Sequence, residues 1–166
     1  MLIFRKNIEM LITLTQGKFA TIDAEDWGLV KEHKWRICKG HNVFYAITHT
    51  RNPDGSPATM YLHRLIMGFP DSPIDHINGD GLNNRKKNLR LCTCRQNLRN
   101  QRSVRGTSKY KGIYWNKQNK RWHASIGVDG QVKYLGIFVN EIEGAEAYDK
   151  AAAELFGKFA CLNFPR

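Results

Sequence analysis

Residues 74–101 read I-D-H-I-N-G-D-G-L-N-N-R-K-K-N-L-R-L-C-T-C-R-Q-N-L-R-N-Q. A short strand is predicted to end near Asp75 and His76, because the turn residues N-G-D-G begin at 78, and 88–91 read as the returning strand. Thr93 with Gln96 three residues later matches a helix capping box. The stretch therefore predicts two strands followed by a helix, a ββα unit.

Three polar residues of this unit, Asp75, His76 and Asn97, are placed so that they could form one site. Neighbouring side chains of a regular strand point to opposite faces, so Asp75 and His76 can converge only where the strand ends and turns. Asn97 falls in the first turns of the predicted helix, beside the hairpin. An acid, an imidazole and several carboxamides are thus expected close together.

The charge pattern points to a polyanionic partner. The chain has a formal net charge of +11, and the 25 residues 85–109 contain nine basic side chains and no acidic one. A solvated helix surface normally mixes both signs, so this run favours contact with phosphates. Nucleic acid is the first candidate, and basic ribosome-like packing or simple solubility are the alternatives.

Composition restricts the class of protein. With 42% hydrophobic residues the chain can form packed cores, and its four cysteines include no C-x-x-C pair. Cys92 and Cys94 are expected to be small core residues. We find neither a signal peptide nor a long apolar run, so we expect a reduced, cytoplasmic protein that binds no membrane and no small-molecule substrate.

The chain is predicted to be α+β, in four segments. Residues 1–60 indicate a β-rich module, with strands near 35–37 and 43–47, a helix from Asp23 as cap to Val30, and a turn at N-P-D-G, 52–55. Residues 61–101 hold the ββα unit after a short helix, Leu62–Met67, in which His63 is expected to be structural. Residues 102–109 indicate a basic linker.

Residues 110–166 predict a three-stranded antiparallel sheet packed on one helix. The stretches 110–115, 121–128 and 132–138 alternate, and Asp129-Gly130 is a hairpin turn. Asn140 begins the helix and Gly157 ends it. The apolar face of this helix is expected to contain Ile142, Ala145, Tyr148, Ala152 and Leu155.

Residues 61–101 resemble the HNH nucleases, in the variant whose last motif position is Asn. The resemblance rests on Asp75-His76, Asn88 and Asn97, and on the neighbours Leu62-His63-Arg64-Leu65 and Asn83-Asn84-Arg85, which are similar to HNH homing endonucleases of phages and group I introns. It implies that Asp75 and Asn97 bind a divalent metal, Mg²⁺ or Mn²⁺, that His76 is the general base, and that the Asn88 amide holds the loop.

Residues 110–164 resemble the Apetala-two/ethylene-response-factor DNA-binding domain. The resemblance rests on Tyr110–Ile113, Arg121–Ile126, Tyr134–Phe138, A-x-A-Y-D-x-A-A at 145–152 and Leu162-Asn163-Phe164. It implies a sheet that docks in the major groove, although the strand positions hold a different mixture of residues from the plant family. Alternation allows only one face to point inward, so about half of the aromatics are expected in the core.

The sequence therefore predicts a site-specific, homing-type DNA endonuclease that nicks one strand of double-stranded DNA, with a monomer favoured. The alternatives are a non-catalytic DNA-binding regulator on a decayed HNH scaffold and an RNA-binding protein. The predicted DNA contacts are Arg85, Lys86, Lys87, Arg95, Arg99, Arg102, Arg105, Lys111, Tyr114, Trp115, Lys117, Lys120, Arg121 and Lys133.

Overall fold

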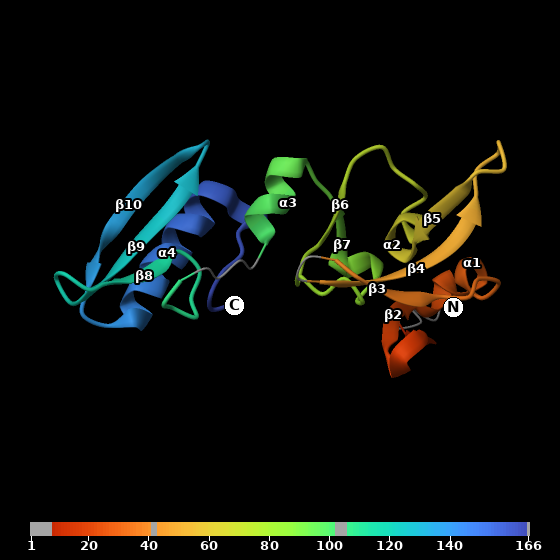
Figure 1. Ribbon diagram of the computed structural model, residues 1–166, viewed down its shortest axis with the longest axis horizontal. Helices are drawn as coiled ribbons and strands as arrows, with labels where there is room; N and C mark the ends of the chain where they lie inside the picture. Colours follow the sequence, from red (N-terminus) through yellow and green to blue (C-terminus); the bar gives the residue numbers. More distant parts are fainter. Residues whose placement is uncertain (1–7, 41–42, 102–105, 166) are drawn as a thin grey trace, which may run out of the picture. The chain divides into compact units, whose positions relative to one another are not determined.

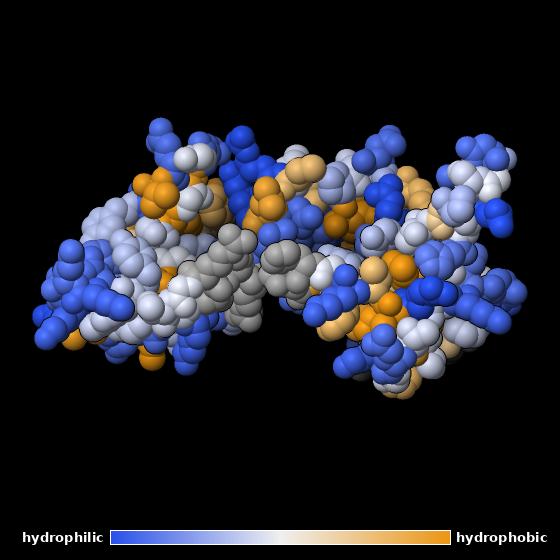
Figure 2. Space-filling model, in the orientation of Figure 1, coloured by the Kyte–Doolittle hydropathy of each residue, from blue (hydrophilic) through white to orange (hydrophobic). Residues whose placement is uncertain are grey.

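The computed structural model describes residues 8–40, 43–101 and 106–165. It confirms the α+β class, with several small antiparallel sheets and a C-terminal three-stranded sheet packed on a long helix. The chain forms two compact units, residues 1–94 and 95–166, which are shown in Figure 1. Each unit has its own hydrophobic core, and Figure 2 shows apolar residues of both units at a mainly hydrophilic surface.

The described residues of the first unit form three small antiparallel sheets, two short α-helices and three 3-10 turns. The sheets are β1 (Glu9–Thr13) with β2 (Phe19–Asp23); β3 (Arg36–Lys39), β4 (Phe44–Arg51) and β5 (Pro57–Tyr61) in that order; and β6 (Ile74–His76) with β7 (Leu89–Leu91). The α-helices are α1 (Trp27–Val30) and α2 (Leu62–Ile66). The 3-10 turns are η1 (Thr15–Gly17) and η2 (Ala24–Asp26), which flank β2, and η3 (Lys86–Asn88), which precedes β7.

One core joins all three sheets of this unit. Its buried members are Ile12, Leu14, Ala20, Ile22, Val30, Trp35, Ala46, Leu62, Ile66, Ile74, Leu89. These residues come from both the predicted N-terminal module and the predicted nuclease stretch. The two predicted segments therefore share a single packed interior, and burial of the same apolar side chains stabilises both.

One helix start in this unit differs from the expectation. We expected Asp23 to cap the helix that follows, but its side chain makes no capping hydrogen bond. The Asp23 carboxylate instead accepts hydrogen bonds from the Arg85 side chain at 2.9 Å and from the Lys86 backbone N–H at 2.9 Å. A cationic partner outweighs a local cap because charge-assisted bonds are stronger than neutral ones.

The second unit consists of most of α3 (Cys94–Asn100), the sheet β10-β9-β8, and α4 (Glu141–Phe156), with the 3-10 turn η4 (Gly157–Phe159) after it. The strands are β8 (Ile113–Asn116), β9 (Arg121–Val128) and β10 (Gln131–Phe138). Asp129 and Gly130 both have positive φ, 50° and 82°, which confirms the predicted hairpin turn. The Asn140 side chain accepts the Ile142 N–H at 2.9 Å and caps α4 as predicted.

The buried face of α4 is shorter along the helix than expected. Ala145, Tyr148 and Ala152 are buried against the sheet, but Ile142 and Leu155 are 46% and 39% exposed. These two residues lie in the first and last turns of α4, whereas the buried residues occupy its middle. The fully buried residues of the helix therefore lie in its central turns, and Phe156 at its end packs partly buried against the same core.

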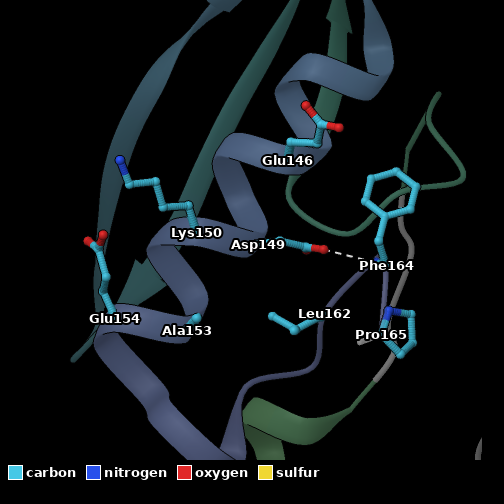
Figure 3. Close-up of a pocket in the computed structure, with 8 residues that line it drawn as sticks. All are labelled: Glu146, Asp149, Lys150, Ala153, Glu154, Leu162, Phe164 and Pro165. Atoms are coloured by element: carbon cyan, nitrogen blue, oxygen red, sulfur yellow. Dashed lines mark hydrogen bonds between the residues drawn. The ribbon is translucent and has the colours of Figure 1, made fainter.

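The chain after α4 folds back along the helix and forms a hollow there (Figure 3). Asp149 holds this segment, because its carboxylate accepts the backbone N–H groups of Asn163 and Phe164 at 2.7 and 2.8 Å. Glu146 and Glu154 also line the hollow. Three carboxylates against a single lysine make the hollow unsuited to binding phosphate.

Among the described residues, no helix is long and apolar enough to cross a membrane.

Candidate active site and nucleic-acid surface

The β6–β7 ribbon holds Asp75 and His76 at the end of a strand. Asp75 pairs with Arg90 across the ribbon and His76 pairs with Leu89. The Arg90 Nε and Nη2 atoms lie 2.7 and 2.5 Å from Asp75 Oδ2. The Asp75 side chain is 4% exposed. Arg90 therefore fixes the position of this buried carboxylate and compensates its charge.

His76 lies on the other side of this strand, because successive side chains of a strand alternate. Its Nε2 atom is 3.2 Å from Asn84 Oδ1, and its ring is 5.1 Å from His63 and 6.0 Å from Tyr45, centroid to centroid. Burial lowers the pKa of His76, and the Asn84 hydrogen bond and the Asp75 charge oppose this only in part. The imidazole is therefore neutral near pH 7, the form that accepts a proton.

His63, on α2, is a second buried imidazole next to His76. Burial, and to a lesser degree the neighbouring His76 and Arg64, lower the pKa of His63 to about 3. Within the described residues its Nδ1 atom has no hydrogen-bond partner. Tyr45 and Tyr61 contact its ring at 5.8 and 5.4 Å. His63 is therefore an uncharged ring in contact with His76.

Asn88 organises the motif loop, which we define as residues 77–85. Its Oδ1 accepts the Asn78 N–H at 3.1 Å, and its Nδ2 donates to Asn83 O at 2.8 Å and to Asn78 Oδ1 at 2.9 Å. Asp80 closes a turn within the loop by accepting the Leu82 N–H at 3.0 Å. The amide of Asn88 therefore connects both ends of the loop.

Two of the predicted DNA contacts have protein partners in the first unit. Arg85 is 3% exposed and forms ion pairs with Asp23 and Glu9. Lys86 pairs with Glu25 and Asp26 at 2.7 and 2.8 Å, which raises the Lys86 pKa. Lys86 and Lys87 are both exposed, but Lys87 forms no ion pair among the residues that the structure describes. The basic run is thus partly neutralised by acids that lie about sixty residues earlier in the chain.

The other basic residues near α3 belong to the second unit. Arg95 and Arg99 approach Asp129 at 2.9 and 3.5 Å, and Lys111 Nζ donates to the backbone oxygens of Arg99 and Gln101. Burial lowers the pKa of Lys111. Arg102 and Arg105 lie outside the described residues. Asn97 is also in this unit, so its pairing with Asp75 as a metal ligand stays a prediction.

The sheet of the second unit divides its aromatic residues between two faces. Trp115 packs on Trp122, a neighbour of the core, at 5.0 Å. Tyr114, His123 and Tyr134 form a row on the opposite face, with ring centroids 5.2 and 5.9 Å apart. The aromatics are therefore shared between core and surface.

The basic residues of this sheet are placed less uniformly. Lys117, Lys120 and Arg121 are exposed at or beside the β8–β9 turn. Lys133 is also exposed, but it pairs with the buried Ile126. Directly paired residues lie on the same face of a sheet, so the Lys133 side chain starts from the α4 side rather than from the face of the aromatic row.

Several of these residues were not singled out by sequence reasoning. Tyr45 was part of a predicted strand and Tyr61 followed a turn, with nothing in their spacing that relates them to His76. Arg90 was one of many basic residues in the run. The signal that identifies them is their contact with the motif, and this contact exists only in the folded chain.

The donor types of the two ligands predicted from the motif suit a hard cation. Among the described residues no group of three or more His, Cys, Asp or Glu side chains could hold a metal ion. The predicted ligands are instead one carboxylate, Asp75, and one amide, Asn97. Oxygen ligands of this kind fit Mg²⁺ or Mn²⁺, which retain water and phosphate oxygens in their coordination sphere.

Comparison with known proteins shows two overlapping similarities. Over 156 residues the chain is 31% identical to an uncharacterized HNH endonuclease of Acanthamoeba polyphaga mimivirus, which covers 89% of this chain and 76% of that protein. Over 62 residues it is 44% identical to the ethylene-responsive transcription factor WRI1 of Arabidopsis thaliana, or 36% of this chain and 14% of that protein. Over 63 residues it is 41% identical to APETALA2-like protein 2 of Oryza sativa subsp. japonica, or 37% and 14%. No family model matches the chain.

Proposed function

Because this chain belongs to the HNH endonuclease family, we propose that it is a site-specific, homing-type DNA endonuclease that hydrolyses a phosphodiester bond with a divalent cation. The observation that carries this proposal is His76, a buried neutral imidazole whose Nε2 is hydrogen-bonded to Asn84, on the same strand as the Asp75 carboxylate that Arg90 fixes. These groups form the proposed ββα-metal core.

His76 takes the proton from the attacking water in this proposal. Its neutral form has a lone pair for that proton, and burial keeps the pKa low enough for this form to dominate near pH 7. The water oxygen then forms a bond to phosphorus, and the bond from phosphorus to the 3′ oxygen breaks. The departing 3′ oxygen takes a proton from solvent, so the products carry a 5′-phosphate and a 3′-hydroxyl.

Asp75 and Asn97 would hold the cation. When bound there, Mg²⁺ or Mn²⁺ would stabilise the negative charge that develops on the departing oxygen. Arg90 contributes by keeping the Asp75 carboxylate in one place, because two of its nitrogens contact the same oxygen. One chain carries one such site, so a monomer would nick a single strand.

The second unit would supply affinity for the target sequence. One plant protein to which the chain is similar over 62 residues is named as a transcription factor, and the sheet of the second unit carries the row Tyr114, His123 and Tyr134 on the face away from its core. Lys117, Lys120 and Arg121 are available beside it for phosphates. Contacts to phosphates would make binding strongly dependent on salt, while contacts to base edges would select the site.

The experiment is nicking of supercoiled plasmid and of phage or bacterial genomic DNA, in Mg²⁺ or Mn²⁺ against a chelator. We expect nicking that requires the cation and that His76→Ala reduces by at least about 100-fold. His49→Ala is the matched control, because His49 is exposed on β4 and contacts Arg36. A wild-type chain that binds duplex DNA tightly and salt-sensitively, yet cuts none of these DNAs, would favour the DNA-binding regulator instead.

A further inference from the structure

We propose that Asn84 is a positioning residue for His76 and that β2 holds Asn84 in place, so that the N-terminal hairpin is part of the nuclease site. This inference rests on the proposed nuclease function. It assigns a role to residues 8–23, which the nuclease motif does not include, and it concerns the orientation and tautomer of His76.

The hydrogen bonds of Asn84 determine which atom faces His76. Its Nδ2 donates to the backbone oxygens of Leu82 at 3.1 Å and Gly81 at 3.5 Å, so the Oδ1 atom points to His76 Nε2 at 3.2 Å. A carbonyl oxygen only accepts, so Nε2 must carry the hydrogen. In the neutral ring the lone pair is then on Nδ1, and Asn84 selects this tautomer.

The backbone of β2 holds Asn84 from both sides. The Thr21 N–H donates to Leu82 O at 2.8 Å, and the Asn84 N–H donates to Thr21 O at 2.7 Å. These two bonds form a parallel bridge between Thr21 and Asn83. Asn84 is fully buried. The motif loop is therefore an additional strand-like neighbour of β2, and its position depends on the hairpin.

An ion-pair cluster fixes the chain directly after Asn84. Asp23, the last residue of β2, accepts from Arg85 Nε with one carboxylate oxygen and from the Lys86 N–H with the other, both at 2.9 Å. Glu9 on β1 also pairs with Arg85. Both Asp23 and Arg85 are buried, so removing either one deprives a buried charge of its buried partner. The bridge and the cluster together hold the loop segment that carries Asn84.

The tautomer of His76 is the first measurement, made on the metal-free full-length chain. Long-range ¹H–¹⁵N correlations of the histidine rings separate the two neutral tautomers. We expect His76 to be protonated at Nε2 in the wild type. Asn84→Asp should retain this tautomer, because aspartate also offers an acceptor oxygen, and Asn84→Ala should show a mixture of the two neutral tautomers. A wild-type His76 protonated at Nδ1 overturns the proposal, as does a ring unaffected by Asn84→Ala. If Asn84→Ala does not fold, the wild type and Asn84→Asp decide.

The contribution of β2 is measured by nicking kinetics of Asp23→Asn against Glu25→Gln. Both variants remove one carboxylate charge beside Lys86, but only Asp23 contacts the Arg85 guanidinium and the Lys86 N–H. We expect kcat to fall about 10 to 100-fold in Asp23→Asn with KM within about threefold, and Glu25→Gln to stay within about twofold.

Two outcomes separate the inference from the proposed function. An inactive wild type refutes the nuclease, while the ring spectra still decide whether Asn84 sets the tautomer of His76. An active wild type whose kcat is unchanged in a folded Asp23→Asn refutes the role of β2. If Asp23→Asn does not fold, hydrogen exchange at the Asn84 amide in the wild type decides, because an amide that β2 holds must be protected.

Discussion

Replacement of Arg90 by methionine is the perturbation whose size follows most directly from the site. Arg90 places two nitrogens within 2.7 Å of one Asp75 oxygen, the Asp75 side chain is 4% exposed, and that of Arg90 is 13% exposed. Arg90→Met therefore leaves a buried carboxylate without its arginine. Removal of one partner from a buried ion pair typically costs 3–5 kcal/mol, so we expect the free energy of unfolding to fall by about 3 kcal/mol.

Urea denaturation of the full chain, followed by circular dichroism, measures this change. Arg95→Met is the matched control, because the Arg95–Asp129 pair has side-chain exposures of 70% and 59% and is expected to contribute less than about 1 kcal/mol. The double variant Asp75→Asn with Arg90→Met removes the charge together with its partner. It should recover at least about 1 kcal/mol relative to the single variant.

An unfolding free energy of Arg90→Met within about 1 kcal/mol of the wild type would refute this reasoning. It would mean that Asp75 is not a buried charge compensated by Arg90. A double variant as unstable as the single one would point to lost packing of the arginine stem rather than to charge.

The remaining predictions concern pH, salt and packing. Burial lowers the pKa of His63 to about 3 from 6.5, so between these pH values the folded chain binds fewer protons than the unfolded chain and stability falls as the pH drops below 6.5. Urea denaturation at pH 6 and 5 should show that His63→Leu reduces the slope of the unfolding free energy against pH, by up to about 1.4 kcal/mol per pH unit. Duplex binding measured against salt should lose about one unit of log–log slope in Lys87→Ala but less in Lys86→Ala, because Lys86 pairs with Glu25 and Asp26 whereas Lys87 forms no ion pair among the described residues. Gly81→Ala should lower the midpoint of thermal unfolding more than Gly79→Ala, because a Cβ at Gly81 would collide with the backbone oxygen of Phe44. A Cβ at Gly79 would meet open space, so that variant should lose only about 1 kcal/mol through its positive φ.

The C-terminal unit was the part of the fold that local sequence predicted best. The alternating strands, the Asp129-Gly130 turn and the Asn140 cap all depend on residues near one another in the chain. Turn and cap residues act within a few positions, so their physical effect is present in the sequence itself. The exposed ends of α4 were missed because periodicity does not show how far the sheet extends over the helix.

The N-terminal half shows where local reasoning ends. Residues 1–60 had no obvious chemistry as a sequence, and the basic run at 85–109 indicated phosphate contact throughout. The structure gives Arg85 and Lys86 acidic partners at Asp23, Glu9, Glu25 and Asp26 instead. A charge run shows its sign and density, but not which of its members are already paired within the protein.

The sequence by itself determined that this chain carries an Asp-His motif with a returning strand and Asn88, and a sheet-and-helix unit behind it, because those patterns are local and their spacing is readable. Only the tertiary structure decided how His76 is held. Asn84, Tyr45 and His63 surround it, and β2 reaches the motif loop from about sixty residues away. Contacts over that distance form only when the chain packs into one core, since no local preference specifies which distant residues will meet.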